Sequence, residues 1–432
     1  AHKLDIRVFL DVVLHHSGDN WSYPFDYDYY YANGERFPLG DWREKDRPLP
    51  IELRDPELYN RKGQIRNFDK YPETQEGDFL TLKTFRNDGS PESEKLGKLL
   101  AAIHCYWIRE TDVDGFRLDA VKHMKGQDIS RFCSSIREYA YSLGKRNFFL
   151  FGEIIGNDET GNPYIGPKML PEDQNVYYGL DSVLDHPLHS VLAGAIKGVS
   201  SPERLLERYS SLQWNALSRG EYGDFLVTYI DDHDQVGTDF KHRFGYDTTP
   251  EQIVAGVGFL LCALGAPCIY YGTEQGLDGN GMDDRYIREG MFDPNDTETN
   301  LLNRNSWIYG KIADLAKLRQ TEPILKFGRM YFRKTSKNTV DFHYPNCEEC
   351  LLTFSRVLHN GEILVVYNSS PKDVKVEYVL IDATINNAGG HMKCIYGGKT
   401  KVKVQKKLDR QDSRLYIKLK VKPMEFLIFK NS

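Results

Sequence analysis

The chain has 432 residues, of which 40% are hydrophobic and 27% charged, and its formal net charge is −6. This balance is typical of a globular protein with one large domain and a smaller one. The negative charge argues against a nucleic-acid or anionic-membrane partner, and no apolar run of about 18 residues predicts a membrane span. Seven cysteines, an odd and low count, do not describe a disulfide framework.

The first predicted element is a strand over residues 6–13, where apolar and β-branched residues follow one another. The stretch 17–91 that follows is polar, rich in Tyr, Trp and Pro, and has little sustained periodicity. So long a stretch within a compact protein is usually a functional excursion or a small subdomain. We therefore predict an inserted subdomain over residues 17–91.

Between residues 92 and 323 predicted helices and strands alternate. Apolar residues at helical spacing predict helices in the segments 96–107, 129–139, 202–217, 249–264 and 309–319. Runs of strand length lie at 115–120, 147–153, 180–185, 225–231 and 267–271. This alternation is typical of a parallel sheet covered by helices. Residues 1–16 and 92–323 are therefore predicted to form one α/β catalytic domain.

The pattern changes after residue 323. Strand-like runs are separated there by turn sequences such as Asn360-Gly361 and Gly389-Gly390, without intervening helices. Short strands joined by turns indicate an antiparallel arrangement. Residues 324–432 are therefore predicted to form a C-terminal β-sandwich domain.

Four polar clusters stand at the predicted carboxyl ends of strands, where a parallel α/β barrel carries its catalytic groups. They lie at residues 11–16, 115–123, 151–154 and 231–234. A single cluster has a simple alternative explanation, because Asp and Glu at a strand end often cap the next helix. Four successive clusters indicate chemistry, because converging carboxylates repel one another and cost stability.

The carboxyl groups of Asp119 and Glu153 suit the cleavage of a glycosidic bond. A retaining glycosidase needs one ionised carboxylate as nucleophile and one protonated carboxyl as general acid. Arg117 lies two residues before Asp119, so both side chains point to the same side of a strand. A guanidinium in that position keeps Asp119 ionised and orients it. His16 and His233 are suited to hydrogen-bonding sugar hydroxyls.

Taken together, the four clusters resemble the four sequence regions of the α-amylase family (glycoside hydrolase family 13), in the same order, and the resemblance covers essentially the whole chain. It implies a (β/α)8 TIM-type barrel with an inserted subdomain after its third strand and a C-terminal antiparallel β domain. The stretch Gly265–Gln275 resembles the eighth strand of the family. Residues 6–13 resemble the third strand, so the chain is expected to carry strands 3–8, as a fragment of a fuller enzyme would.

The resemblance implies a role for each residue. It makes Asp119 the nucleophile, Glu153 the general acid/base and Asp234 the carboxylate that stabilises the distorted sugar. The other implied residues line or support the substrate subsites: His16, Arg117 and His233 around the attacked glucose, Lys122 and His123 on the leaving-group side, and Asp11 as a structural support.

A structural calcium ion is also implied by the resemblance, but the expected ligands are altered. The first region usually carries an Asn ligand, and His15 stands at that position. Imidazole is a poor ligand for a cation that prefers oxygen. The ligand from the inserted subdomain matches at best Asp78, and only weakly. We therefore predict that no cofactor is required and that calcium binding at this position is disfavoured.

The sequence predicts a retaining hydrolase that cleaves α-glucosidic bonds in starch-like α-glucans or maltooligosaccharides, working as a monomer. Two alternatives stay open. The same residues suit a transglycosylase or an isomerising enzyme, which differs only in what attacks the covalent intermediate. A catalytically silent glucan-binding relative is disfavoured because all three carboxylates are present. The compartment is not indicated.

Overall fold

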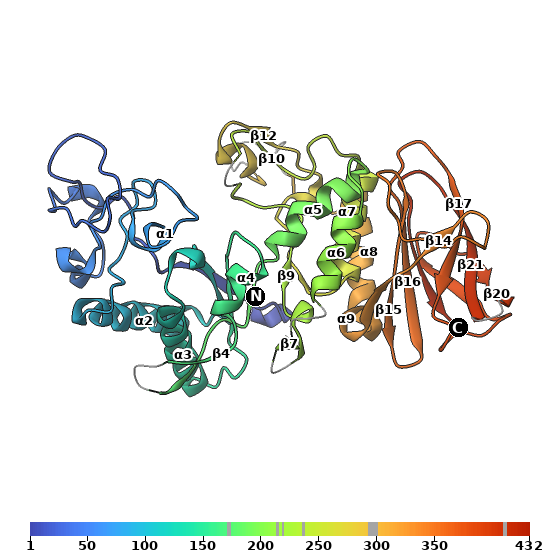
Figure 1. Ribbon diagram of the computed structural model, residues 1–432, viewed down its shortest axis with the longest axis horizontal. Helices are drawn as coiled ribbons and strands as arrows, with labels where there is room; N and C mark the ends of the chain where they lie inside the picture. The colour runs from blue at the N-terminus through green and yellow to red at the C-terminus, as the bar shows by residue number, and fades with distance from the viewer. Residues whose placement is uncertain (171–173, 213–215, 218–219, 236–237, 293–300, 409–412) are drawn as a thin grey trace. The chain divides into compact units, whose positions relative to one another are not determined.

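The computed structural model describes residues 1–170, 174–212, 216–217, 220–235, 238–292, 301–408 and 413–432 (Figure 1). These residues form two compact units, Ala1–Leu184 and Asp185–Ser432. Within the described ranges, no helix has both the length and the apolar character needed to cross a membrane. All seven cysteines are free thiols.

The first unit is built on a sheet of four parallel strands in the order β1-β2-β3-β6. The strands are β1 (Phe9–Val13), β2 (Gly115–Asp119), β3 (Phe149–Gly152) and β6 (Ser182–Val183). The inner strands supply the core, and Phe116, Leu118 and Leu150 are completely buried. β1 forms one edge of this sheet, and its Phe9 and Val13 are 40% and 39% exposed.

Two long helices, α2 (Pro91–Thr111) and α3 (Gly126–Ser142), lie side by side next to this sheet (Figure 1). α2 begins after Ser90, whose hydroxyl accepts the Ser93 amide at 3.3 Å and satisfies a donor that the helix leaves open. His104 of α2 contacts the rings of Phe116 and Phe132, which joins both helices to β2. The smaller elements of this unit follow α3: α4 (Asp158–Gly161), η6 (Asn162–Tyr164) and the hairpin β4 (Pro167–Met169) with β5 (Val176–Tyr178).

The stretch between β1 and α2 has little regular structure. It is held by isolated β-bridges, among them Trp21 with Trp42 and Tyr59 with Phe85, and by a core of aromatic side chains. Trp21 and Tyr59 are completely buried. The unit's remaining short elements are η1 (His2–Leu4), η2 (Glu44–Asp46), η3 (Ile51–Arg54), η4 (Pro56–Leu58), α1 (Glu73–Glu76) and η5 (Val121–His123).

The second unit begins with helices and short strands. Its helices are α5 (His186–Lys197), α6 (Glu203–Leu212), α7 (Pro250–Cys262), α8 (Trp307–Thr321) and α9 (Pro323–Phe327). β9 (Val227–Thr228) pairs in parallel with β11 (Ala266–Pro267). The other short elements are β7 (Ala216–Leu217), β8 (Gly220–Glu221), η7 (Tyr222–Asp224), β10 (Lys241–His242), η8 (Thr273–Gln275), β12 (Asn280–Gly281) and η9 (Asp284–Ile287).

Two antiparallel sheets make up the rest of this unit. One has the order β13-β15-β16-β22-β18-β19 and the other β14-β17-β21-β20. Buried residues of both sheets, such as Leu364 and Ile417, share one core, as in a β-sandwich. The strands are β13 (Arg329–Phe332), β14 (Thr335–Ser336), β15 (Leu351–Leu358), β16 (Gly361–Asn368), β17 (Lys375–Ile381), β18 (His391–Tyr396), β19 (Lys401–Lys403), β20 (Gln405–Leu408), β21 (Ser413–Val421) and β22 (Phe426–Asn431).

Several predicted elements are shorter in the structure. The strand predicted over 225–231 is observed only at Val227–Thr228, because only these two of its residues pair with β11. Tyr229 and Ile230 are buried without ladder pairing. The helix predicted over 202–217 ends at Leu212; residues 213–215 lie outside the described residues, and 216–217 pair as β7.

Candidate functional site

The Arg117 guanidinium contacts three carboxylates at the carboxyl end of the first unit's sheet. Its Nη1 donates to Asp11 Oδ1 at 2.9 Å and to Asp119 Oδ1 at 2.5 Å, and its Nη2 lies 2.8 Å from Glu153 Oε1. Strand register explains the first contact, because Asp11 of β1 is paired directly with Arg117 of β2. The structure thus brings together four of the residues singled out from the sequence.

In this cluster a single guanidinium faces three carboxylates. Burial of the Arg117 side chain, which is 11% exposed, acts to lower its pKa, but the neighbouring carboxylates of Glu153, Asp11 and Asp119 raise it well above the usual value. Arg117 is therefore a permanent cation. It forms an ion pair with each of these three carboxylates. The side chains of Asp119 and Glu153 are 24% and 13% exposed, so both are largely withdrawn from water.

The backbone after Asp119 also reaches Glu153. Ala120 has a φ of 51°, in the left-handed region, and its amide donates to Glu153 Oε2 at 3.2 Å. The Glu153 amide donates to Leu118 O at 2.8 Å, which fixes the acid at the end of β3. Glu153 is thus held by a charged side chain and by a backbone amide of the neighbouring strand end.

His16 lies beside this cluster. The Asp119 carboxylate acts on its imidazole electrostatically, and its ring stacks on Phe79 with 5.6 Å between centroids. Burial lowers the pKa of His16 to about 4; the Asp119 carboxylate partly opposes this and His123 adds to it. At neutral pH the ring is therefore uncharged, so one ring nitrogen can donate a hydrogen bond and the other can accept one.

His123 belongs to a buried cluster of rings. Its ring centroid lies 5.4 Å from that of His15 and 5.0 Å from that of Phe79, and its Nδ1 is 2.7 Å from Thr74 O. Only 7% of His123 is exposed. Lys122, the other residue predicted on the leaving-group side, forms an ion pair with Asp69 of the inserted stretch. Both residues therefore connect η5 to the inserted stretch.

The residues at the expected calcium position do not fit that ion. His15 is 2% exposed, and its Nδ1 lies 3.1 Å from Nδ1 of His16, so imidazole nitrogens stand where oxygen ligands are needed. Asp78 is completely buried, and its carboxylate accepts the Tyr23 hydroxyl at 2.7 Å and the Thr84 amide at 3.0 Å. Burial raises the pKa of Asp78 to about 6. Among the described residues, no group of three or more His, Cys, Asp or Glu side chains is arranged to hold a metal ion.

The fourth polar cluster, residues 231–234, lies in the second unit and follows β9. His233 Nδ1 is 2.9 Å from Asp232 Oδ1, and its backbone carbonyl accepts Arg288 Nε at 2.8 Å. Burial acts to raise the pKa of Asp232, but His233 lowers it below the usual range. For Asp234, burial and then the neighbouring Asp284 raise the pKa. The polar groups around Asp234 are therefore Asp232, His233, Asp284 and Arg288.

Arg243, which the sequence analysis missed, supports this loop. It is completely buried, and it donates through Nε to Glu289 Oε2 at 2.6 Å and through Nη1 to Tyr271 O at 2.8 Å. Its guanidinium also lies 4.4 Å from the Tyr270 ring centroid, and it acts to lower the pKa of Asp231, which burial raises to about 6. Nothing in its local sequence marks it, because its partners lie 12 to 46 positions away along the chain.

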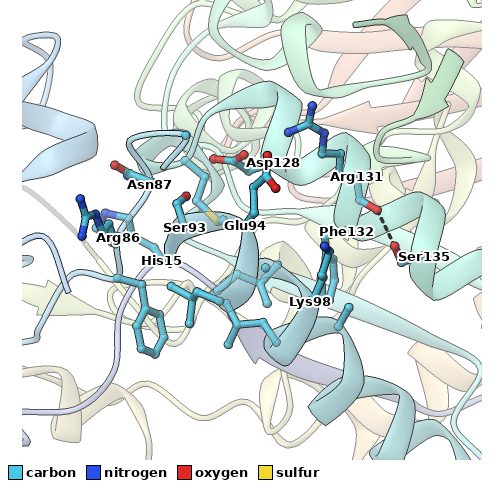
Figure 2. A pocket seen from close by; sticks show the side chains of 18 of the residues that line it. His15, Arg86, Asn87, Ser93, Glu94, Lys98, Asp128, Arg131, Phe132 and Ser135 are labelled. Atoms are coloured by element: carbon cyan, nitrogen blue, oxygen red, sulfur yellow. Dashed lines mark hydrogen bonds between the residues drawn. The ribbon is translucent and has the colours of Figure 1, made fainter. Parts of the chain in front are cut away.

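A cavity of about 400 Å³ lies between α2, α3 and residues 85–89 (Figure 2). His15 lines it, but Asp119 and Glu153 do not, so the cavity is separate from the carboxylate cluster. Apolar side chains such as Leu96 and Phe132 form part of its wall. Its charged lining residues are Arg86, Glu94, Lys98, Asp128 and Arg131.

Comparison with known proteins identifies related sequences and folds. The family model described as alpha amylase, catalytic domain, matches residues 1–311. An alpha-amylase of Streptomyces lividans is 26% identical in an alignment of length 389 that covers 76% of this chain and 39% of that protein. A cyclomaltodextrin glucanotransferase of Thermoanaerobacterium thermosulfurigenes is 30% identical over 245 residues, or 56% of this chain and 29% of that protein. The chain thus spans less than half the length of these two relatives.

A solved structure of an alpha-amylase has a similar fold. The alpha-amylase from Geobacillus thermoleovorans, complexed with acarbose, superposes with a TM-score of 0.68 at 18% identity, covering 100% of this chain and 78% of that one. At that identity the likeness shows the fold alone. The fold is a TIM barrel followed by a C-terminal β domain.

Proposed function

Because the chain belongs to the α-amylase family, we propose that it is a retaining glycoside hydrolase that cleaves α-glucosidic bonds in starch-like α-glucans or maltooligosaccharides, working as a monomer. The observation that carries the proposal is the binding of both Asp119 and Glu153 by one buried guanidinium. The double-displacement mechanism uses two carboxyl groups that flank the bond to be cleaved.

In the first step, an oxygen of the ionised Asp119 attacks the anomeric carbon. The bond from that carbon to the glycosidic oxygen breaks, and Glu153 gives its proton to the departing oxygen. Arg117 Nη1 donates a charge-assisted hydrogen bond of 2.5 Å to Asp119 Oδ1, which orients this carboxylate for the attack. His16, uncharged at neutral pH, is assigned a hydrogen bond with a hydroxyl of the attacked glucose, and the contribution of Asp119 to its pKa supports a position beside that carboxylate.

In the second step, the Glu153 carboxylate takes a proton from water, whose oxygen attacks the anomeric carbon and releases Asp119. Glu153 Oε1 contacts Arg117 Nη2 and Glu153 Oε2 accepts the Ala120 amide, so both carboxyl oxygens are held in position for the two proton transfers. Asp234 is assigned the stabilisation of the distorted sugar, with His233 as a further substrate contact. Asp11 supports Arg117, and Lys122 and His123 are assigned to the leaving-group side.

The assay is the release of reducing sugar from soluble starch and maltoheptaose by the chain as it stands. Asp119→Asn and Glu153→Gln should each lower kcat by about a thousandfold or more, because each removes one partner of the double displacement. Glu94→Gln, on the exposed face of α2, is the matched control and should keep full activity. Activity that persists in both site variants would show that other residues carry the reaction.

A labelling experiment separates the two roles. A slow substrate, 5-fluoro-α-glucosyl fluoride, should leave a glucosyl group on the peptide that contains Asp119, visible by mass spectrometry. With Glu153→Ala, azide should restore turnover of an activated aryl maltoside, because azide needs no general base. A label on any other carboxylate contradicts the assignment of the nucleophile.

Transglycosylation is a second candidate, because one relative is a cyclomaltodextrin glucanotransferase at 30% identity. It uses the same first step, after which a sugar hydroxyl replaces water. Chromatography of the products from maltoheptaose separates the two: hydrolysis gives only shorter oligosaccharides, whereas transfer also gives longer or cyclic ones. A silent glucan-binding protein would show no products at all.

A further inference from the structure

Four aromatic rings of the inserted stretch are stacked in a row, which we call the ring ladder: Phe25, Tyr27, Tyr29 and Tyr23. Tyr27 and Tyr29 have centroids 4.3 Å apart and planes 17° apart, and Tyr29 and Tyr23 are 4.4 Å and 20° apart. Phe25 continues the row at 6.0 Å from Tyr27, with the ring planes only 9° apart. Because the planes are nearly parallel along the whole row, the outer face of Phe25 forms its flat end.

The inner end of the ring ladder is anchored. The Tyr23 hydroxyl donates to Asp78 at 2.7 Å and accepts the Gly63 amide at 2.8 Å. Burial, together with the Asp78 carboxylate, raises the pKa of Tyr23 far above its usual range, so the hydroxyl stays protonated. Tyr29 is 6% exposed and packs edge-on against Phe37 at 5.0 Å. The row therefore stands on a fixed base.

The outer end is open to solvent. Phe25 is 67% exposed and Tyr27 is 61% exposed, although both belong to a row whose inner members are packed. A single exposed aromatic ring is ordinary. Two adjacent exposed rings held nearly parallel by a packed base are a preorganised apolar surface, and such surfaces on soluble proteins commonly mark binding sites.

Polar groups flank this surface. Asp26 and Asp28 alternate with the rings along the chain and are exposed, and the Tyr30 hydroxyl donates to Asp28 at 3.4 Å. The Arg66 guanidinium lies 4.8 Å from the Tyr30 ring centroid. The flat outer face of Phe25, with the exposed ring of Tyr27 beside it, suits the C–H face of a pyranose ring, and the carboxylates next to these rings suit its hydroxyls. The two aspartates also disfavour an anionic membrane surface.

We propose that Phe25 and Tyr27 form a glucan-binding platform that shares no residue with the Arg117 cluster and holds a chain of the polysaccharide while the carboxylates act. The ligand class rests on the proposed function. The platform shares no residue with the reacting groups, so its loss weakens the binding of long glucans and leaves the chemistry of a short substrate unchanged.

Affinity electrophoresis in gels containing amylopectin tests the platform. The double variant Phe25→Ala/Tyr27→Ala should bind amylopectin about tenfold more weakly, because the outer face of Phe25 and the exposed ring of Tyr27 that supports it are both lost. Phe25→Tyr should bind like the parent. Tyr141→Ala removes a ring that is 65% exposed on α3 and serves as the matched control. Melting curves verify that each variant is folded.

The parallel assay is kcat/KM on a chromogenic maltotrioside, which should be equal in the parent, the double variant and the control. Equal retention of parent and double variant in the amylopectin gel overturns the platform, and so does a parent that is not retained. A parent retained by the gel but inactive on every α-glucan refutes the proposed hydrolysis and keeps the platform. Equal loss of kcat/KM and of binding would place the rings in the reaction site instead.

Discussion

Acidification should destabilise the folded chain through the buried imidazole of His16. Its pKa is about 4 in the folded chain, against 6.5 for an ordinary histidine, because burial disfavours the charged ring. Because folding lowers this pKa, the contribution of His16 to the free energy of unfolding is fully present above pH 6.5 and is lost as the pH falls towards 4. The unfolded chain then takes up a proton that the folded chain does not.

The size of the effect follows from the two pKa values. At pH 4.5 an ordinary histidine is almost fully protonated, whereas His16 is mostly neutral. With 1.36 kcal/mol per pKa unit, the folded chain should lose about 2 to 3 kcal/mol between pH 7 and pH 4.5 from this group alone. His15 and His123 should add to the loss, because burial lowers their pKa values as well.

Urea unfolding followed by circular dichroism measures this loss. The carboxylates of the chain also respond to pH, so the test is a comparison between variants at pH 7 and pH 4.5. His16→Gln should lose about 2 to 3 kcal/mol less than the parent over this interval. His359→Gln, at an exposed turn between β15 and β16, should behave like the parent. Superposable pH dependences of the parent and His16→Gln would refute the reasoning.

Three further predictions concern stability. Chelation by EDTA should leave the thermal unfolding midpoint unchanged, because the site around His15 offers nitrogen and not oxygen ligands; a midpoint that rises with added calcium and saturates would contradict this. Arg243→Met should lower the free energy of unfolding by about 3 kcal/mol or more, because it leaves Asp231 buried without its guanidinium neighbour; an unchanged urea midpoint would argue against this support. Gly97→Ala in α2 should raise the stability by about 0.5 to 1 kcal/mol, because a methyl group there meets no atom within 4 Å; urea unfolding shows whether it instead falls.

The cluster around Arg117 illustrates what the sequence can predict. Arg117 and Asp119 are two positions apart on a strand, so alternation alone places them on one side. The meeting of residues from different strands follows from the fold class, because parallel strands end at a common edge. Asp11, Asp119 and Glu153 do share the Arg117 guanidinium in the structure.

Other features depend on contacts between distant residues, which no local sequence pattern predicts. The burial of His123 results from rings supplied by the inserted stretch, which has no periodic signal. Apolar runs report burial and not ladder pairing, so Tyr229 and Ile230 were expected in a strand that ends before them. The division into domains 1–16 with 92–323, 17–91 and 324–432 stays a prediction, as do the numbering of the strands as 3–8 and the roles of the individual site residues.

Ala120, which follows Asp119, has a backbone conformation that L-amino acids avoid at a cost of about 1 to 2 kcal/mol. The same conformation directs its amide to Glu153. The conformation of Ala120 therefore lowers the stability of the chain while it orients the amide. A substitution that relaxes this backbone would weaken the hydrogen bond to Glu153, 33 positions later. A glycine there would make the chain more stable and the acid less well held. Directed evolution for thermostability would therefore select Ala120→Gly, whereas selection for turnover would retain Ala120.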